Sequence, residues 1–157
     1  MKKKWMVFSV FMMVLVLAAC GNEAKDSPEK DQAVSGTADE KAVTLKLLES
    51  EPLGEYLADS KGMTLYYFKN DKSGKSNCMG DCLKKWTPFM ERDFAVPKGF
   101  EVNDFGTIQR EDTGEEQVTY KGFPLYYFAN DKAAGDVNGE GVKNVWYIVN
   151  NKTIFPK

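Results

Sequence analysis

Two cysteines four residues apart, Cys78 and Cys82, are the side chains of this sequence whose type and spacing are best suited to chemistry. On a helical turn, Cα atoms at that spacing lie about 6 Å apart, within the range that a disulfide spans. Such a pair has three roles open to it: a structural disulfide, a redox-active pair, and a copper(I) site completed by Met79. The structural disulfide is the favoured interpretation if the chain is exported, because disulfides persist outside the cytosol.

The 157-residue chain contains no histidine, which removes much of the chemistry that the cysteines could otherwise join. Ser-His-Asp and Cys-His catalytic units need an imidazole, and so do the usual zinc and copper sites. No phosphate loop or dinucleotide fingerprint occurs. We therefore identify no catalytic residue, cofactor or metal site, and favour a non-enzyme, although carboxylate pairs that hydrolyse glycosides stay open. Oxygen ligands for calcium cluster at Asp136, Asn138 and Glu140, but an Asn-Gly turn explains these residues more simply.

The N-terminus has the pattern of an export signal. Lys2–Lys4 form a positive segment, and Trp5–Ala19 is an uncharged apolar run that is too short to cross a bilayer comfortably. Residues 17–20 read Leu-Ala-Ala-Cys and resemble the bacterial lipobox, in which the cysteine receives diacylglycerol and palmitate chains. We predict that residues 1–19 are a lipoprotein signal peptide and that Cys20 is the lipidated N-terminus, since two or more acyl chains anchor a protein lastingly.

Residues 20–44 are predicted to be a flexible linker, because they are charged, contain no aromatic residue and offer little apolar area to bury. The remaining residues, 45–157, suffice for one small folded domain. Without residues 1–19 the chain has 18 basic and 23 acidic residues, a net charge of −5. It has no basic stripe, so we expect no binding to nucleic acid.

The folded part contains an internal duplication. Residues 54–89 align with residues 114–149 at a constant offset of 60, and 12 of the 36 pairs are identical. The longest match is Leu-Tyr-Tyr-Phe-x-Asn-Asp-Lys, which begins at Leu65 and again at Leu125. Two copies are too few for a solenoid, so we expect one pseudo-twofold domain with repeat 1 at about 54–96 and repeat 2 at about 114–157. In this alignment the counterparts of Cys78 and Cys82 are Asn138 and Val142.

The elements that position these residues are predicted to be short strands, which gives a mainly β fold. Helical signals are confined to one short turn at residues 82–85, and turns with glycine, asparagine or aspartate separate the strands. The predicted strands are residues 55–58, 63–68, 106–110, 117–120, 123–128 and 145–150.

The aromatic run of each repeat carries two alternatives. Along a strand, Tyr66 and Phe68 share one face while Leu65 and Tyr67 share the other, so both faces are apolar. The favoured interpretation is a pair of central strands buried on both faces. The alternative is an open face on which a flat ligand stacks, and its candidate residues are Tyr67, Trp86, Tyr127 and Trp146.

At these motifs the chain resembles the bacterial family of secreted or lipoprotein repeats that is marked by Tyr-x-(Phe/Trp/Tyr)-x-x-Asp. Here the motif occurs as Tyr66-x-Phe68-x-x-Asp71 and as Tyr126-x-Phe128-x-x-Asp131. The likeness continues through Ser76-Asn77-Cys78-x-Gly80-x-Cys82 and Trp86-x-Pro88. The resemblance implies an exported repeat protein and brings no established biochemical activity with it.

Together these patterns predict a lipid-anchored, extracytoplasmic, non-catalytic module that binds a small molecule or an envelope partner. Its membrane contact is the lipid on Cys20. Two alternatives remain: a thiol-redox or electron-transfer accessory that uses Cys78 and Cys82, and a purely structural envelope protein. An exposed aromatic groove would favour binding, whereas an accessible sulfur beside Lys84 or Lys85 would favour redox chemistry.

Overall fold

The computed structural model describes residues 43–157, and the predicted signal peptide, Cys20 and linker residues up to 42 lie outside that range. The described part is mainly β, as predicted, with three short 3-10 helices. Its strands are β1 (Val43–Thr44), β2 (Lys46–Ser50), β3 (Gly54–Ala58), β4 (Tyr66–Phe68), β5 (Trp86–Pro88), β6 (Phe94–Ala95), β7 (Phe105–Gln109), β8 (Glu116–Tyr120), β9 (Phe123–Phe128) and β10 (Trp146–Ile148). The helices are η1 (Gly80–Lys84), η2 (Val102–Asp104) and η3 (Val142–Asn144).

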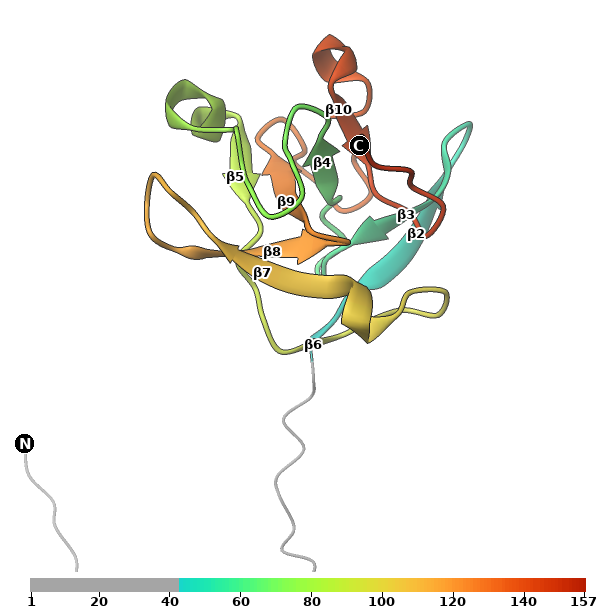
Figure 1. Ribbon diagram of the computed structural model, residues 1–157. Coiled ribbons are helices and arrows are strands. Elements are labelled where there is room, and N and C mark those ends of the chain that lie inside the picture. Colours follow the sequence, from blue (N-terminus) through green and yellow to red (C-terminus); the bar gives the residue numbers. More distant parts are fainter. Residues whose placement is uncertain (1–42) are drawn as a thin grey trace, which may run out of the picture. The chain divides into compact units, whose positions relative to one another are not determined.

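A six-stranded antiparallel sheet forms the centre of the domain, with strand order β10-β4-β9-β8-β7 and β5 paired to the remaining length of β9. A hairpin of β2 and β3 and a short parallel pair of β1 and β6 complete the fold. Figure 1 shows η1 and η3 at the same end of the domain, and β6 at the opposite end, where the described chain begins.

The strand registers establish a pseudo-twofold axis between β4 and β9. Tyr66 pairs with Tyr126, its own counterpart in the duplication. On one side of this pair, Trp146 of β10 lies opposite Phe68 of β4, and on the other side Trp86 of β5 lies opposite Phe128 of β9. The two flanking pairs are equivalent, so the duplication seen in the sequence is also a symmetry of the sheet.

The repeats exchange their outer strands. Strand β5 belongs to repeat 1 but pairs with β9 of repeat 2, while β10 of repeat 2 pairs with β4 of repeat 1. Each repeat therefore completes the sheet of the other. Because strand pairing supplies the backbone hydrogen bonds, neither central strand is satisfied within its own repeat.

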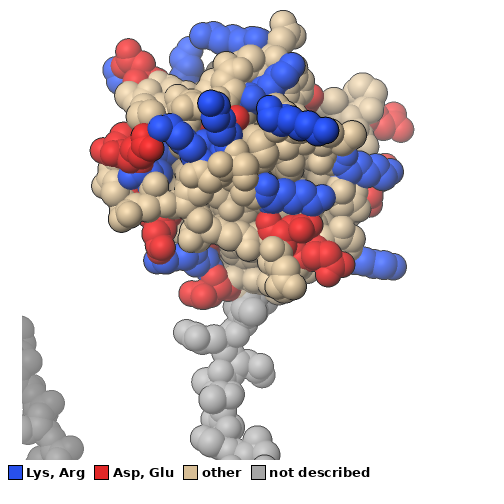
Figure 2. All heavy atoms as spheres, in the orientation of Figure 1, with Lys and Arg blue, Asp and Glu red and all other residues tan. Residues whose placement is uncertain are grey.

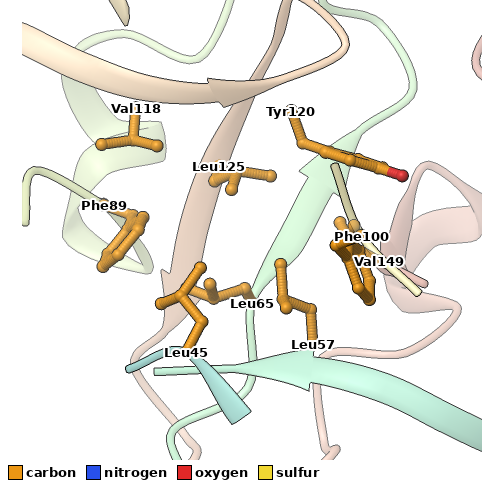
Figure 3. Close-up of a cluster of buried hydrophobic side chains, with 9 residues drawn as sticks. All are labelled: Leu45, Leu57, Leu65, Phe89, Phe100, Val118, Tyr120, Leu125 and Val149. Carbon is orange, nitrogen blue, oxygen red and sulfur yellow. The ribbon is translucent and has the colours of Figure 1, made fainter. Parts of the chain in front are cut away.

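The central strands are buried on both faces, which confirms the favoured interpretation of the aromatic runs. Tyr66 and Tyr126 belong to one core cluster, and Leu65 and Leu125 belong to the other. The second cluster lies between the central sheet and the strands that precede that sheet in the chain, β1–β3 (Figure 3). It consists of Leu45, Leu57, Leu65, Phe89, Phe100, Val118, Tyr120, Leu125 and Val149. Aromatic and aliphatic burial of this kind is the main favourable term for so small a domain.

The gapless alignment at an offset of 60 is wrong for the strands that precede the two aromatic runs. Leu57 N–H donates to Val149 O and Val118 N–H donates to Phe89 O, which makes Leu57 and Val118 counterparts at an offset of 61. The cause is a turn one residue shorter in repeat 2, where Lys121 and Gly122 both have positive φ (50° and 84°). Two consecutive positive φ values are the geometry of a tight hairpin turn, which glycine adopts without cost.

Several element predictions also need correction. The sequence interpretation expected one helical turn, and the described chain has three, because η3 is the counterpart of η1 in the second repeat and η2 is a local turn. It missed β2, β5 and β6, whose residues lack strict alternation. Val43 and Thr44, assigned to the linker, form β1 and pair with β6.

Candidate functional site

Four aromatic rings form a continuous stack across the pseudo-twofold axis. The rings of Trp86 and Trp146 lie parallel at 3.7 Å between centroids. Phe68 stacks on the outer face of Trp146 and Phe128 on that of Trp86, both at 4.3 Å. The stack thus alternates between repeats, and both indoles are only 3% exposed. Their faces are occupied by protein, so a ligand can reach only their edges.

Gly139 lets the stack pack against the motif tyrosine of repeat 1. A Cβ on Gly139 would lie 2.7 Å from Tyr66 Cζ and 3.0 Å from Trp86 Cη2. No side chain fits there, because real Cβ contacts are longer than 3 Å. The end of the Trp86 benzo ring therefore points into the protein, and the loop that carries Gly139 seals that side of the stack.

A cleft of about 480 Å³ opens where the edges of the two indoles meet the surface between η1 and η3. Lys85 and Lys143 lie on its rim, one from each repeat, and Asp81 and Cys82 of η1 form one wall. The remaining lining residues are Phe68, Asn70, Trp86, Val145 and Trp146. The face drawn in Figure 2 has Lys and Arg side chains gathered over its upper part, toward the end that carries η1 and η3.

The candidate ligand residues predicted from the sequence separate into two groups. Trp86 and Trp146 line the cleft by their edges. Tyr67 and Tyr127 point to the opposite face of the sheet, where Tyr67 packs against Phe155 and the Tyr127 hydroxyl donates to Asp59 Oδ2 at 2.9 Å. A single stacking platform made of all four side chains is therefore absent from the described domain.

The family motif forms a reciprocal lock between the repeats. The hydroxyl of Tyr66 in repeat 1 donates to Asp131 Oδ2 in repeat 2 at 2.7 Å, and that of Tyr126 in repeat 2 donates to Asp71 Oδ2 in repeat 1 at 2.7 Å. Both carboxylates are buried. Their second oxygens accept backbone N–H groups, from Asn77 at 2.6 Å and from Asn138 at 2.9 Å.

The matched contacts of Asn77 and Asn138 correct the cysteine alignment. Because both residues donate to the motif aspartate, they are counterparts, and Cys78 corresponds to Gly139 instead of Asn138. Repeat 1 thus places a buried sulfur where repeat 2 leaves only a glycine against the aromatic stack.

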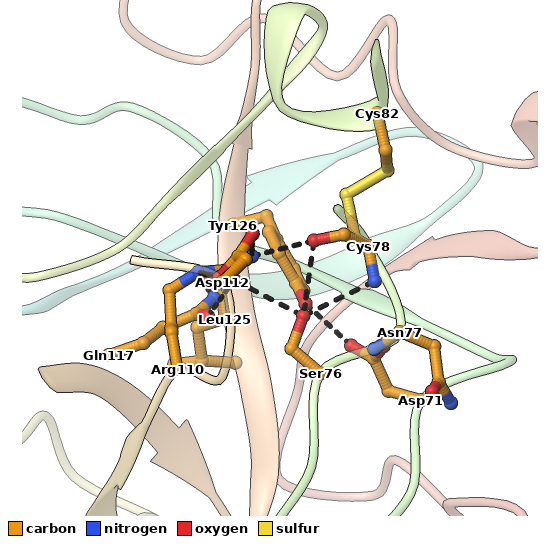
Figure 4. The surroundings of a disulfide bond; sticks show 10 residues. All are labelled: Asp71, Ser76, Asn77, Cys78, Cys82, Arg110, Asp112, Gln117, Leu125 and Tyr126. Atoms are coloured by element: carbon orange, nitrogen blue, oxygen red, sulfur yellow. Dashed lines mark hydrogen bonds and ion pairs between the residues drawn. A yellow bond between two sulfur atoms is a disulfide. The ribbon is translucent and has the colours of Figure 1, made fainter. Parts of the chain in front are cut away.

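The predicted disulfide is present between Cys78 and Cys82, with Cα atoms 5.4 Å apart (Figure 4). Cys78 is fully buried, and Cys82 is partly exposed at the wall of the cleft. The bridge ties the loop after Asp71 to η1. Its sulfurs are consumed by the bond, so the copper(I) alternative has no free thiolate ligands in this state.

Arg110 anchors the same loop from the other side and was not identified from the sequence. Its guanidinium is 2% exposed and donates to Cys78 O at 2.7 Å, Gln117 Oε1 at 2.5 Å and Asp112 Oδ2 at 2.8 Å. It also donates to Ser76 Oγ, which lies 2.7 Å from the Tyr126 hydroxyl (Figure 4). A buried arginine that satisfies so many acceptors positions the disulfide loop and the motif tyrosine together.

Metal binding gains no support from the described residues. The oxygens weighed for calcium are used within the protein: Asp136 Oδ2 accepts Lys132 N–H and Ala133 N–H, and Glu140 Oε2 accepts Ile148 N–H. Within residues 43–157 no group of three or more His, Cys, Asp and Glu side chains is placed to hold a metal ion.

One sequence family matches the chain in two places, at residues 49–90 and again at residues 106–150, and it is described as a secreted repeat of unknown function. The chain belongs to this family. Both matches contain the Tyr-x-Phe-x-x-Asp motif, so the secreted-repeat signature coincides with the reciprocal lock. No curated protein and no solved structure matches the chain significantly. The secreted repeats place this protein outside the cytosol, and residues 43–157 contain no helix long and apolar enough to cross a bilayer.

The reciprocal lock should make the stability of the folded domain depend on pH through the carboxyl group of Asp71. Burial raises the pKa of Asp71 to about 6, against the hydrogen bonds from Asn77 N–H and Tyr126, which lower it. The folded domain therefore favours protonated Asp71 more than the unfolded chain does. This stabilisation is fully present at pH values below the pKa of Asp71 in the unfolded chain, and it is lost as pH rises through about 6. The free energy of unfolding of the wild type, relative to Asp71→Asn, should fall by about 1–3 kcal/mol between pH 4 and pH 7. Urea titrations at both pH values test this, and parallel pH profiles of the two proteins would contradict it.

Proposed function

We propose that this protein is a lipid-anchored, non-catalytic binding module whose binding surface is the cleft between η1 and η3. The observation that carries this proposal is the position of the cleft. Its lining comes from both repeats and includes residues of η1 and η3, and Figure 1 shows these two helices at the end of the domain opposite the start of the described chain. A surface that both repeats share, at the end of the domain opposite the residue that follows the predicted linker, leaves room for an envelope partner.

The chemistry of the lining supports binding over catalysis. The cleft offers ammonium groups, an amide and indole edges, while its acid, Asp81, is paired with Lys84 at 2.7 Å. The sulfur of Cys82 is held in a disulfide, so it is not a nucleophile in this state. Among the described lining residues there is no pairing of a nucleophile with a general base.

The anchor is tested by Cys20→Ser. This variant should remain unprocessed by the lipoprotein-specific peptidase and should carry no acyl chain, because the sulfur that receives diacylglycerol is gone. Metabolic labelling with palmitate, followed by membrane fractionation, measures both effects. If Cys20→Ser is labelled and processed like the wild type, the anchor is located elsewhere.

The binding surface is tested with a matched pair of substitutions. Asn70→Trp fills the cleft, whereas Asn130→Trp makes the same change at the counterpart position, which does not line it. Both asparagines are exposed. The soluble domain, residues 43–157, should co-sediment with the cell-envelope fraction of its own bacterium, and Asn70→Trp should weaken this at least tenfold while Asn130→Trp does not. If both variants sediment like the wild type, or if the wild type is not retained, the cleft is not the binding surface and a purely structural role is favoured.

A thiol-redox accessory is the second candidate, because partly exposed Cys82 and Lys85 line the same cleft. If the bridge is only structural, its reduction should lower the free energy of unfolding by about 2 kcal/mol and the melting temperature by roughly 4–8 °C. Repeat 2 folds with Gly139 and Val142 at the corresponding places, so the domain should stay folded.

A thiol redox titration of residues 43–157 separates the two candidates. A structural bridge should have a midpoint below about −300 mV. A midpoint near −200 mV would favour the redox candidate over the binding module, since the bridge would then exchange with mild reductants.

A further inference from the structure

We propose that the cleft between η1 and η3 binds an anionic group, a phosphate or a carboxylate, through Lys85 and Lys143. This inference rests on the proposed binding function and names the chemical class of the ligand. The argument starts from the two lysines, because one comes from each repeat and both reach the same cleft.

The two lysines are unpaired, unlike two other lysines of the domain. Lys84 pairs with Asp81 at 2.7 Å, and Lys75 pairs with Glu111 at 2.9 Å. By contrast, the ammonium groups of Lys85 and Lys143 form no ion pair or hydrogen bond with any residue in the described range. Two uncompensated cations beside one concave surface attract an anion, because the cleft walls reduce the screening by water.

The floor of the cleft adds further donors. Neither Trp86 nor Trp146 uses its indole N–H in a hydrogen bond within residues 43–157, and neither nitrogen is sealed from solvent. An indole nitrogen is a donor only. The single acid of the lining, Asp81, is already occupied by Lys84. The polar groups left for a ligand are therefore predominantly donors, which an oxyanion accepts.

The backbone that carries Lys143 has a conformation that lysine rarely adopts. Lys143 has φ 53° and ψ 18°, and the next residue, Asn144, has φ 57°. A non-glycine residue in the left-handed region costs of order 1 kcal/mol, and such costs are concentrated at functional sites. A glycine would occupy position 143 with less strain, so a lysine there agrees with a role for its ammonium group.

The anion could be supplied by a phosphate polymer or by an acidic polysaccharide, because lysine binds both as a compact point charge. The domain would meet either ligand outside the cytosol, because the chain belongs to a family of secreted repeats. A neutral polysaccharide is expected to bind poorly, since the aromatic faces that would stack on sugar rings are already buried within the four-ring stack.

The experiment titrates the ¹⁵N-labelled domain, residues 43–157, with a glycerol phosphate oligomer, with polygalacturonate and with neutral dextran. The indole N–H signals of Trp86 and Trp146 report on the cleft. We expect saturable shifts with at least one polyanion and none with dextran, and weaker binding at 200 mM than at 20 mM salt by about tenfold or more. Shifts with the phosphate oligomer alone, or with polygalacturonate alone, identify the source of the anion.

The variant Lys85→Gln/Lys143→Gln should bind the polyanion at least tenfold more weakly. The control Lys98→Gln, which removes an exposed charge from the loop after β6, should bind like the wild type. Unchanged affinity in the double variant, or no shift with either polyanion, would overturn the anion site. The proposed function would survive that result if envelope binding still depended on Asn70→Trp. Conversely, lysine-dependent polyanion binding without envelope retention would uphold the anion site and reject the envelope-binding function.

Discussion

Either repeat expressed alone, as residues 43–104 or 105–157, is expected to be unfolded. Without repeat 2, strand β4 loses both of its partners, β9 and β10. Strand β5 loses its partner β9. Repeat 1 also loses half of the Trp86–Trp146 stack. A chain of some 50–60 residues has little surface to bury even when its strands are paired, and here they are not.

Amide NMR spectra of the two halves provide the measurement. Each half should give the narrow dispersion of an unfolded chain, and an equimolar mixture should regain dispersion in part, because each half supplies the outer strand of the other. The intact domain serves as the control. A well-dispersed spectrum from a single half would show that a repeat folds by itself, and the exchanged-strand account would be rejected.

The second large effect is expected at the motif tyrosines. Tyr126→Phe and Tyr66→Phe should each lower the free energy of unfolding by about 2–3 kcal/mol, because each leaves a buried carboxylate without one of its donors. Tyr147→Phe is the matched control: its hydroxyl donates to Asn144 O at an exposed position, so its loss should cost less than about 1 kcal/mol. Equal costs for all three substitutions, measured by urea denaturation, would argue against a lock at the motif.

Much of the fold was predictable because the duplication and the alternation of aromatic residues are local patterns. The faces of Tyr66 and Leu65 followed from the two-residue period of a strand, and the disulfide from the spacing of its cysteines. The identities between residues 60 positions apart, however, carry no information about which strands pair. The exchange of β5 and β10 between repeats was therefore beyond the sequence.

The candidate site was only partly predictable, for a similar reason. Trp86 and Trp146 were chosen as aromatics, but that their faces are consumed by Phe68 and Phe128 depends on tertiary packing. Lys143 lines the cleft from a left-handed backbone conformation, which the sequence does not predict because position 143 is not a glycine. Arg110 resembles any strand-end arginine until its acceptors are brought together from distant segments.

The central claim is that the tyrosine and aspartate of the motif lock each repeat onto the other. Double-mutant cycles on the free energy of unfolding test it most directly, because they isolate the pairwise coupling. Tyr126→Phe combined with Asp71→Asn, a pair that spans the repeats, should show a coupling of about 1–3 kcal/mol. Tyr66→Phe combined with Asp71→Asn, a pair within one repeat, should be additive within about 0.5 kcal/mol. Coupling within the repeat and additivity across the repeats would contradict the account.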